Sequence, residues 1–122
     1  MNKDVLGKLG EDAAARYLTK LGYIILARRW RERRFEIDLI AKDGDEIVFV
    51  EVKTRNGVAY GYPEESITEQ KQRHLRNSAL YFLESKKLYN RRYRIDVVAV
   101  LFLSNTTDVK FHLIRSAVGG VD

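Results

Sequence analysis

Four charged residues stand inside two apolar stretches whose β-branched and aromatic content predicts strands. Glu36 and Asp38 belong to the first stretch, and Glu51 and Lys53 belong to the second. An unpaired charge is expensive to bury, so these residues need either partners or a function. Two or three carboxylates beside a lysine are the chemistry of a site that binds Mg2+ or Mn2+ and cuts a phosphodiester. In such a site the metal polarises the phosphate and helps to form hydroxide, while the lysine orients water or stabilises developing charge.

The two stretches predict a β-hairpin, because Asp43-Gly44 between them is a strong turn signal. Side chains alternate along a strand, so the loop length decides which charges meet. A two-residue loop at Asp43-Gly44 sets Glu36 opposite Glu51, whereas a four-residue loop starting at Asp43 sets Asp38 opposite Glu51. A three-residue loop would send Asp38 and Glu51 to opposite faces. In both permitted registers Asp38 and Glu51 are opposite or diagonal, within reach of one ion.

Several segments carry a resemblance to a known family. Asp38, twelve intervening residues and then Glu51-Val52-Lys53 resemble the D…E-x-K signature of the restriction-endonuclease-like PD-(D/E)xK nucleases. A wider string, from about Leu6 to Val100, closely resembles the YraN-like family of small bacterial proteins, which is similar to archaeal Holliday junction resolvases. Its main segments are Gly10-Glu11-Asp12-Ala13-Ala14, Leu21-Gly22-Tyr23, Glu36-Ile37-Asp38-Leu39-Ile40-Ala41 and Phe49-Val50-Glu51-Val52-Lys53-Thr54-Arg55. Phe35 stands where this family usually has Gly.

The resemblance implies a metal-dependent endonuclease with a restriction-endonuclease-like αβββαβ core. Lys53 would orient the attacking water, and Glu11 matches the site acid on the N-terminal helix of the resolvase-like nucleases. By analogy, branched DNA is an expected substrate and a homodimer an expected assembly. The residues that would hold Mg2+ or Mn2+ are Asp38, Glu51, the backbone carbonyl of Val52, Glu11 and Glu36.

The element that would position Glu11 is an N-terminal helix. Asn2 to about Leu21 shows helical apolar periodicity, and Gly22 is suited to end the helix. On spacing alone Glu11 is a solvated surface glutamate, and only the resemblance favours a site acid. A strip of small residues beside Glu11 would let this helix approach a sheet closely: Gly7, Gly10 and Ala14.

A run of five arginines and one tryptophan follows the predicted first strand, Tyr23 to Ala27. We interpret residues 28–34 as a basic loop in which some arginines contact phosphate, the alternative being a solvated loop. Trp30 is expected to pack in the core or at an edge rather than to stack on a base. The net charge of +5 and the pI near 9.5 favour a polyanionic partner, and DNA is expected. The predicted phosphate-binding residues are Arg28, Arg29, Arg31, Arg33, Arg34, Arg55, Lys71, Arg73 and Arg76.

The segment after the hairpin predicts a turn-rich loop and then a helix. The loop spans residues 55–63, and its Tyr60 and Tyr62 either contact substrate sugars or cover the core. Residues 66–69 have the pattern of a capping box, which predicts a helix from there to about Lys87.

The first half of that helix carries a basic face. Gln70 and Lys71 are candidates for contact with phosphate or with the site, the alternative being solvation. His74 is expected at the surface. The two histidines, His74 and His112, stand in unrelated contexts and the chain has no cysteine, which argues against a zinc site.

The C-terminal part predicts two strands. Ile95 to Leu103 is apolar enough for a central strand, and its one charge, Asp96, is expected to pair with an arginine for structural reasons. A turn at residues 106–108 leads to a last strand at an edge, Val109 to Ile114. Residues 117–122 are interpreted as a loose tail.

The whole chain of 122 residues is predicted to be one α/β domain with a mixed central sheet flanked by helices. No signal peptide or transmembrane stretch is apparent, and the absence of cysteine suits a reducing cytoplasm. Three hypotheses follow. The protein is a metal-dependent nuclease, a non-catalytic nucleic-acid-binding module with a vestigial nuclease site, or a protein whose hairpin charges form purely structural ion pairs.

Overall fold

Five strands form one mixed sheet in the order β1-β2-β3-β4-β5, in a computed structural model that describes residues 2–57, 67–103 and 108–119. The elements in chain order are α1 (Lys3–Lys20), β1 (Ile24–Glu32), β2 (Phe35–Asp43), β3 (Glu46–Asn56), α2 (Glu69–Ser85), β4 (Tyr93–Phe102) and β5 (Val109–Val118). Strands β3 and β4 are parallel because the chain crosses over through α2, and the other pairs are antiparallel. The α/β class, the mixed sheet and the αβββαβ order are therefore as predicted.

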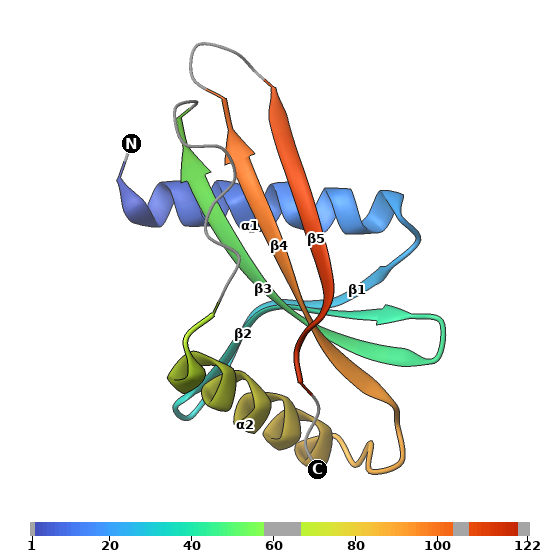
Figure 1. The fold of residues 1–122 in the computed structure, drawn as a ribbon. Helices are drawn as coiled ribbons and strands as arrows, with labels where there is room; N and C mark the ends of the chain where they lie inside the picture. The colour runs from blue at the N-terminus through green and yellow to red at the C-terminus, as the bar shows by residue number, and fades with distance from the viewer. Residues whose placement is uncertain (1, 58–66, 104–107, 120–122) are drawn as a thin grey trace.

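The two helices cover opposite faces of the sheet (Figure 1). On one face, Ala14 and Leu18 of α1 pack with Val48 and Val50 of β3. On the other face, α2 packs on Ile40 and Phe49 among other residues. Alternation along β3 sends successive apolar residues to the two cores, which explains its nearly continuous apolar sequence.

Helix α1 begins and ends where its sequence predicts. The Asn2 side chain accepts a hydrogen bond from the Val5 N–H at 2.8 Å, and Gly22 follows the C-cap with a φ of +99°, which favours glycine. The small-residue strip is confirmed only in part. Gly10 is buried against Thr54 of β3, while nothing lies within 4 Å of a side chain added at Gly7.

Asp96 has the structural partners that were predicted for it. Its carboxylate is fully buried and accepts hydrogen bonds from Arg94 Nε at 3.1 Å and from the Ser116 N–H at 2.9 Å. The same guanidinium also binds Asp43 at 2.9 Å and Glu46 at 2.7 Å. Arg94 thereby ties the interior of β4 to the turn between β2 and β3.

The arginine run was wrongly predicted to be a loop. Strand β1 continues through Glu32, and only Arg33 and Arg34 form the turn into β2, with Arg33 in the left-handed region at φ +57°. The strand persists because Trp30 within the run packs against the α2-side core, as does Ala27 just before the run. Trp30 meets Phe82 edge-on with ring centroids 5.4 Å apart, so its predicted core packing is confirmed.

Two other boundaries were also wrong. Helix α2 starts at Glu69 with Thr68 as its N-cap, whose hydroxyl accepts from the Lys71 N–H at 3.2 Å, so the helix does not start from the expected capping box. Strand β5 runs on to Val118, which is buried in the core, so residues 117–118 are not part of a tail. Several residues named above lie outside the described ranges: Tyr60, Tyr62, Ser66, Thr106, Thr107 and 120–122.

None of the described helices has the length and apolar character needed to cross a lipid bilayer.

Candidate active site

The hairpin register brings two of the predicted acids together. Asp43 pairs with Glu46, and the register continues to the pair Leu39 and Val50. The turn is therefore Gly44-Asp45, with Gly44 at φ +61°, rather than Asp43-Gly44. This is the register that a four-residue loop would give. Asp38 and Glu51 are therefore the residues that follow the last pair on the two strands.

Beyond that last pair the two strands part. Strand β2 continues beside β1, and β3 continues beside β4. At the same point the side chains of β2 change face. Ile37 packs in the α2-side core, whereas Leu39 packs in the α1-side core. Residues two apart on a regular strand would share a face. Asp38, between them, thus lies in a notch of the sheet where side chains from both faces can reach it.

Three carboxylates meet in this notch. The Asp38 carboxylate lies close enough to both Glu11 of α1 and Glu51 of β3 to raise the pKa of each. It is held in place by the Val52 N–H, which donates to Asp38 Oδ2 at 2.8 Å. The acids that the sequence placed on three separate elements are therefore neighbours, with Asp38 in the middle.

Cations flank the three acids. Arg29 Nε lies 3.1 Å from Glu11 Oε1, and Lys71 Nζ lies 3.5 Å from Glu51 Oε2. The half-buried Lys53 follows two residues after Glu51 on the same strand and faces the same way. Lys71 was predicted to contact either phosphate or the site, and its ion pair with Glu51 agrees with the second alternative. Arg29 was predicted to contact phosphate, and its pattern did not indicate that it would lie against an acid.

Burial and mutual repulsion shift the acidity of two members of the cluster. Burial, followed by the negative charge of Asp38, raises the pKa of Glu11 to about 7, although Arg29 opposes the shift. The same two causes in the same order raise the pKa of Glu51 to about 8, with Lys71 opposing. Both acids therefore hold protons at pH values where an exposed glutamate is fully ionised.

The donor set fits a hard divalent cation in its chemistry. Carboxylate oxygens are the ligands that Mg2+ and Mn2+ prefer, and Glu11 Oε1 is buried without a hydrogen bond although Arg29 is close. With Arg29 and Lys71 against the acids, however, the part of the chain that the structure describes contains no group of three acidic, histidine or cysteine side chains placed to hold a metal. A cation would therefore have to displace at least one of these two ion pairs.

Glu36, the further candidate ligand, does not join the cluster. Its side chain is 48% exposed and pairs with Arg31, whose Nε lies 3.5 Å from Glu36 Oε2. Its backbone N–H donates a hydrogen bond to the hydroxyl oxygen of Ser78 on α2, with 3.4 Å between nitrogen and oxygen. Glu36 therefore lies at the surface of the β1–β2 hairpin.

The other predicted phosphate-binding residues are spread over several surfaces. Arg28 pairs with Asp12 at 3.3 Å. The turn residues Arg33 and Arg34 are exposed, as is Arg55 near the end of β3.

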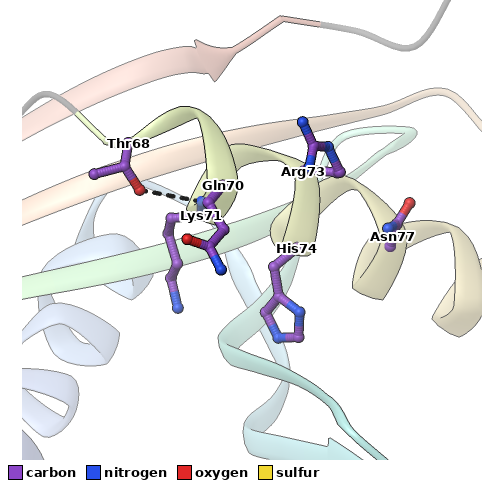
Figure 2. A pocket seen from close by; sticks show the side chains of 6 residues that line it. All are labelled: Thr68, Gln70, Lys71, Arg73, His74 and Asn77. Carbon is purple, nitrogen blue, oxygen red and sulfur yellow. Dashed lines mark hydrogen bonds between the residues drawn. The ribbon is translucent and has the colours of Figure 1, made fainter.

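The two remaining predicted residues lie in separate hollows. Arg73 is exposed and lines a hollow on α2 with His74 and Lys71 (Figure 2). Arg76 instead lines a hollow with Glu46 and Arg94.

Comparison with known proteins places the chain in a family. The model of the uncharacterised protein family UPF0102 matches residues 10–100. The chain belongs to this family. A UPF0102 protein of Caldicellulosiruptor saccharolyticus is 48% identical over 117 residues, 96% of this chain and 99% of the relative. One of Rhodococcus opacus is 52% identical over 96 residues, covering 79% and 81% of the two chains. The resemblance to the YraN-like family is confirmed, and every acid of the cluster lies within the matched UPF0102 region.

A structural comparison finds a similar chain in Archaeoglobus fulgidus Hjc, described as a Holliday junction resolvase from an archaeal hyperthermophile. The TM-score is 0.46 and the sequence identity 17%, with 86% of this chain and 74% of that chain covered.

Proposed function

We propose that this protein is a divalent-metal-dependent nuclease that hydrolyses a phosphodiester of nucleic acid. The observation that carries the proposal is the meeting of Glu11, Asp38 and Glu51 from three elements at one notch of the sheet, beside Lys53. No structural need explains three neighbouring carboxylates, because the repulsion among them costs stability. A bound cation would offset this cost.

Each residue has a role in the proposed reaction. Asp38, Glu51 and the Val52 carbonyl would hold Mg2+ or Mn2+, which when bound would neutralise phosphate charge and acidify water. Lys53 orients the attacking water. Glu11 lies beside Asp38 and would accept the proton of that water. Lys71, released from Glu51, donates to a phosphate oxygen.

The proposed substrate is DNA, recognised by charge and shape through the basic residues around the notch. The motif resemblance to the archaeal resolvases favours a branched structure, and a junction with two equivalent cuts favours a homodimer. A reducing cytoplasm is the proposed compartment.

A specific observation supports a second candidate. Glu11 and Glu51 already have cationic partners in Arg29 and Lys71, as a vestigial site would. In that case the protein binds nucleic acid without cutting it.

Cleavage of a labelled panel separates the two candidates. Single strand, duplex, flap and four-way junction would be incubated with Mg2+, Mn2+ or EDTA. The proteins compared are the wild type, Asp38→Asn, Lys53→Ala and Asp45→Asn, the last an exposed turn acid that serves as the matched control. We expect metal-dependent cuts that fall about 100-fold or more in the first two variants and persist in the control. Binding of the panel by all four proteins without any cut would establish the non-catalytic module instead.

A metal-binding readout makes the proposal independent of the correct substrate. The melting temperature of the wild type should rise with Mg2+ or Mn2+, and the rise should vanish in Glu51→Gln. A melting temperature that is indifferent to both metals would contradict the proposed metal site.

A further inference from the structure

An aromatic stack lies between the β1–β2 turn and α2, and the proposed reaction does not use it. The half-buried ring of Phe35, the first residue of β2, stacks on Tyr81 with centroids 4.7 Å apart and ring planes 25° apart. It also faces His74 with centroids 6.4 Å apart and planes 21° apart. The guanidinium of Arg34 lies 5.1 Å from the centre of the same ring.

The spacing along α2 shows how these rings are arranged. His74 and Tyr81 are seven residues apart, about two helical turns or 10.5 Å. Phe35 therefore lies between them, and its ring is closer to Tyr81 than to His74. A flat ring inserted between two parallel rings needs about 7 Å, because each aromatic contact takes about 3.5 Å. The centroids of Phe35 and His74 are 6.4 Å apart, so these two rings would have to move apart slightly to admit a base.

Polar groups surround the His74 end of the stack. His74 lines a hollow of about 470 Å3 on α2, together with Thr68, Gln70, Lys71, Arg73 and Asn77. Figure 2 shows Gln70, Lys71 and His74 extending from the same side of the helix. Among the described residues no acidic side chain lines the hollow, so it suits an anion. Such a hollow is also large enough for one nucleotide.

The hollow is connected to the acid cluster through Lys71. Lys71 Nζ lies 3.5 Å from Glu51 Oε2. His74 follows Lys71 by three residues on α2, so the two side chains are about one helical turn apart. A nucleotide in the hollow would therefore stand next to a phosphate placed at the cluster. Trp30 cannot serve as the stacking residue because both Phe82 and Tyr81 pack around it.

We propose that Phe35 and His74 clamp one unpaired nucleobase next to the phosphodiester that is cut. The inference rests on the proposed nuclease function and specifies its substrate as nucleic acid with a single-stranded nucleotide at the cleavage point. Lys71 and Arg73 contact the phosphates of this nucleotide, and the Gln70 amide reaches the edge of its base. Base stacking of this kind is tolerant of sequence, since every base has an aromatic face.

The test compares two DNA duplexes of the same sequence, one fully paired and one with a single unpaired 2-aminopurine. Binding would be measured in EDTA, where no cutting occurs, together with the fluorescence of the 2-aminopurine. The wild type should bind the unpaired DNA more tightly and quench its fluorescence. Phe35→Leu, which keeps apolar packing on Tyr81, should lose the quenching and about tenfold of the affinity for the unpaired DNA only.

One further variant tests His74, and another serves as a control outside the stack. His74→Leu should lose the quenching in the same way, and Tyr89→Leu, at a side chain 68% exposed and outside the stack, should behave as wild type. Equal binding of both duplexes by the wild type, or full quenching by Phe35→Leu, would overturn the clamp while leaving the nuclease proposal intact. A wild type that binds neither duplex would overturn both.

Discussion

Asp38 occupies a position that lowers the stability of the folded protein. Its charge stands between two partly buried glutamates and, after burial itself, is the next largest cause that raises the pKa of Glu11 and of Glu51. A raised pKa means that the folded chain binds protons more tightly than the unfolded chain does. The free energy of unfolding must therefore fall as the pH rises from the ordinary glutamate value through the folded-state values.

The first prediction concerns this pH dependence. In EDTA the free energy of unfolding should drop by several kcal/mol between pH 4.5 and pH 8, because Glu11 and Glu51 must ionise in the fold. Asp38→Asn should flatten the drop and raise the melting temperature at pH 8, while Asp45→Asn should change neither. Urea unfolding at half-unit steps of pH measures both effects. A stability that increases over this range, or that is equally steep in Asp38→Asn, would contradict the described cluster.

The sequence predicts a site residue well when local strand pattern fixes its position, and poorly when tertiary packing does. Asp38 and Glu51 were predictable because strand periodicity and a two- or four-residue loop leave few registers. Glu11 required the family resemblance, since its spacing alone is that of a surface residue. Contact of Lys71 with the site was one of two alternatives that the helix pattern left open. The contact of Arg29 with Glu11 was not predictable, because it depends on how the side chains of β2 change face at Asp38.

At the level of elements, the distance between α1 and the sheet depends on one glycine. A Cβ added at Gly10 would lie 2.8 Å from Cγ2 and 2.9 Å from Cβ of Thr54 on β3, closer than such atoms approach in real structures. The same helix carries Glu11 as its next residue. The packing of α1 and the position of the site acid are therefore coupled.

The second prediction follows from that coupling. Gly10→Ala should lower the free energy of unfolding by about 1–2 kcal/mol, because overpacking outweighs the better helix propensity of alanine, and it should lower cleavage by displacing Glu11. Gly7→Ala, in the same helix but in open space, is the matched control and should be neutral or stabilising by up to about 1 kcal/mol. Thermal melts of the two variants decide between these outcomes. Equal melting temperatures would show that α1 does not approach β3 as closely as described.

The elements themselves were predictable where local patterns and tertiary packing agree. Both helices and the core of every strand follow from apolar periodicity, as for Val48, Phe49 and Val50 of β3. The failure at β1 has a physical cause. Arg28 to Glu32 looks like a loop by charge, yet Trp30 and the pairing with β2 hold it as a strand, and its exposed arginines pair with acids of α1 and β2.

Over the whole molecule, the basic residues are not evenly distributed around the notch. The β1–β2 turn presents Arg33 and Arg34, and the first half of α2 presents Lys71 and Arg73, so two basic surfaces flank the aromatic stack. Helix α1 covers the opposite face of the sheet. If nucleic acid is held by phosphate contacts, the net charge of +5 matters less than which of its charges face the substrate.

The third prediction tests this arrangement through salt. Binding of duplex DNA in EDTA should weaken linearly in a plot of the logarithm of affinity against the logarithm of salt concentration, because bound cations are released from phosphates. Arg33→Ala combined with Arg73→Ala should make the slope shallower by about two, close to one phosphate contact for each residue. The control pair, Arg16→Ala with Lys20→Ala, removes the same charge from exposed positions on α1 and should leave the slope unchanged. Because both double variants lower the net charge equally, equal slope changes would mean that DNA responds to total charge alone. A shallower slope only in the first pair would locate the DNA on the side of the notch that carries the α2 hollow.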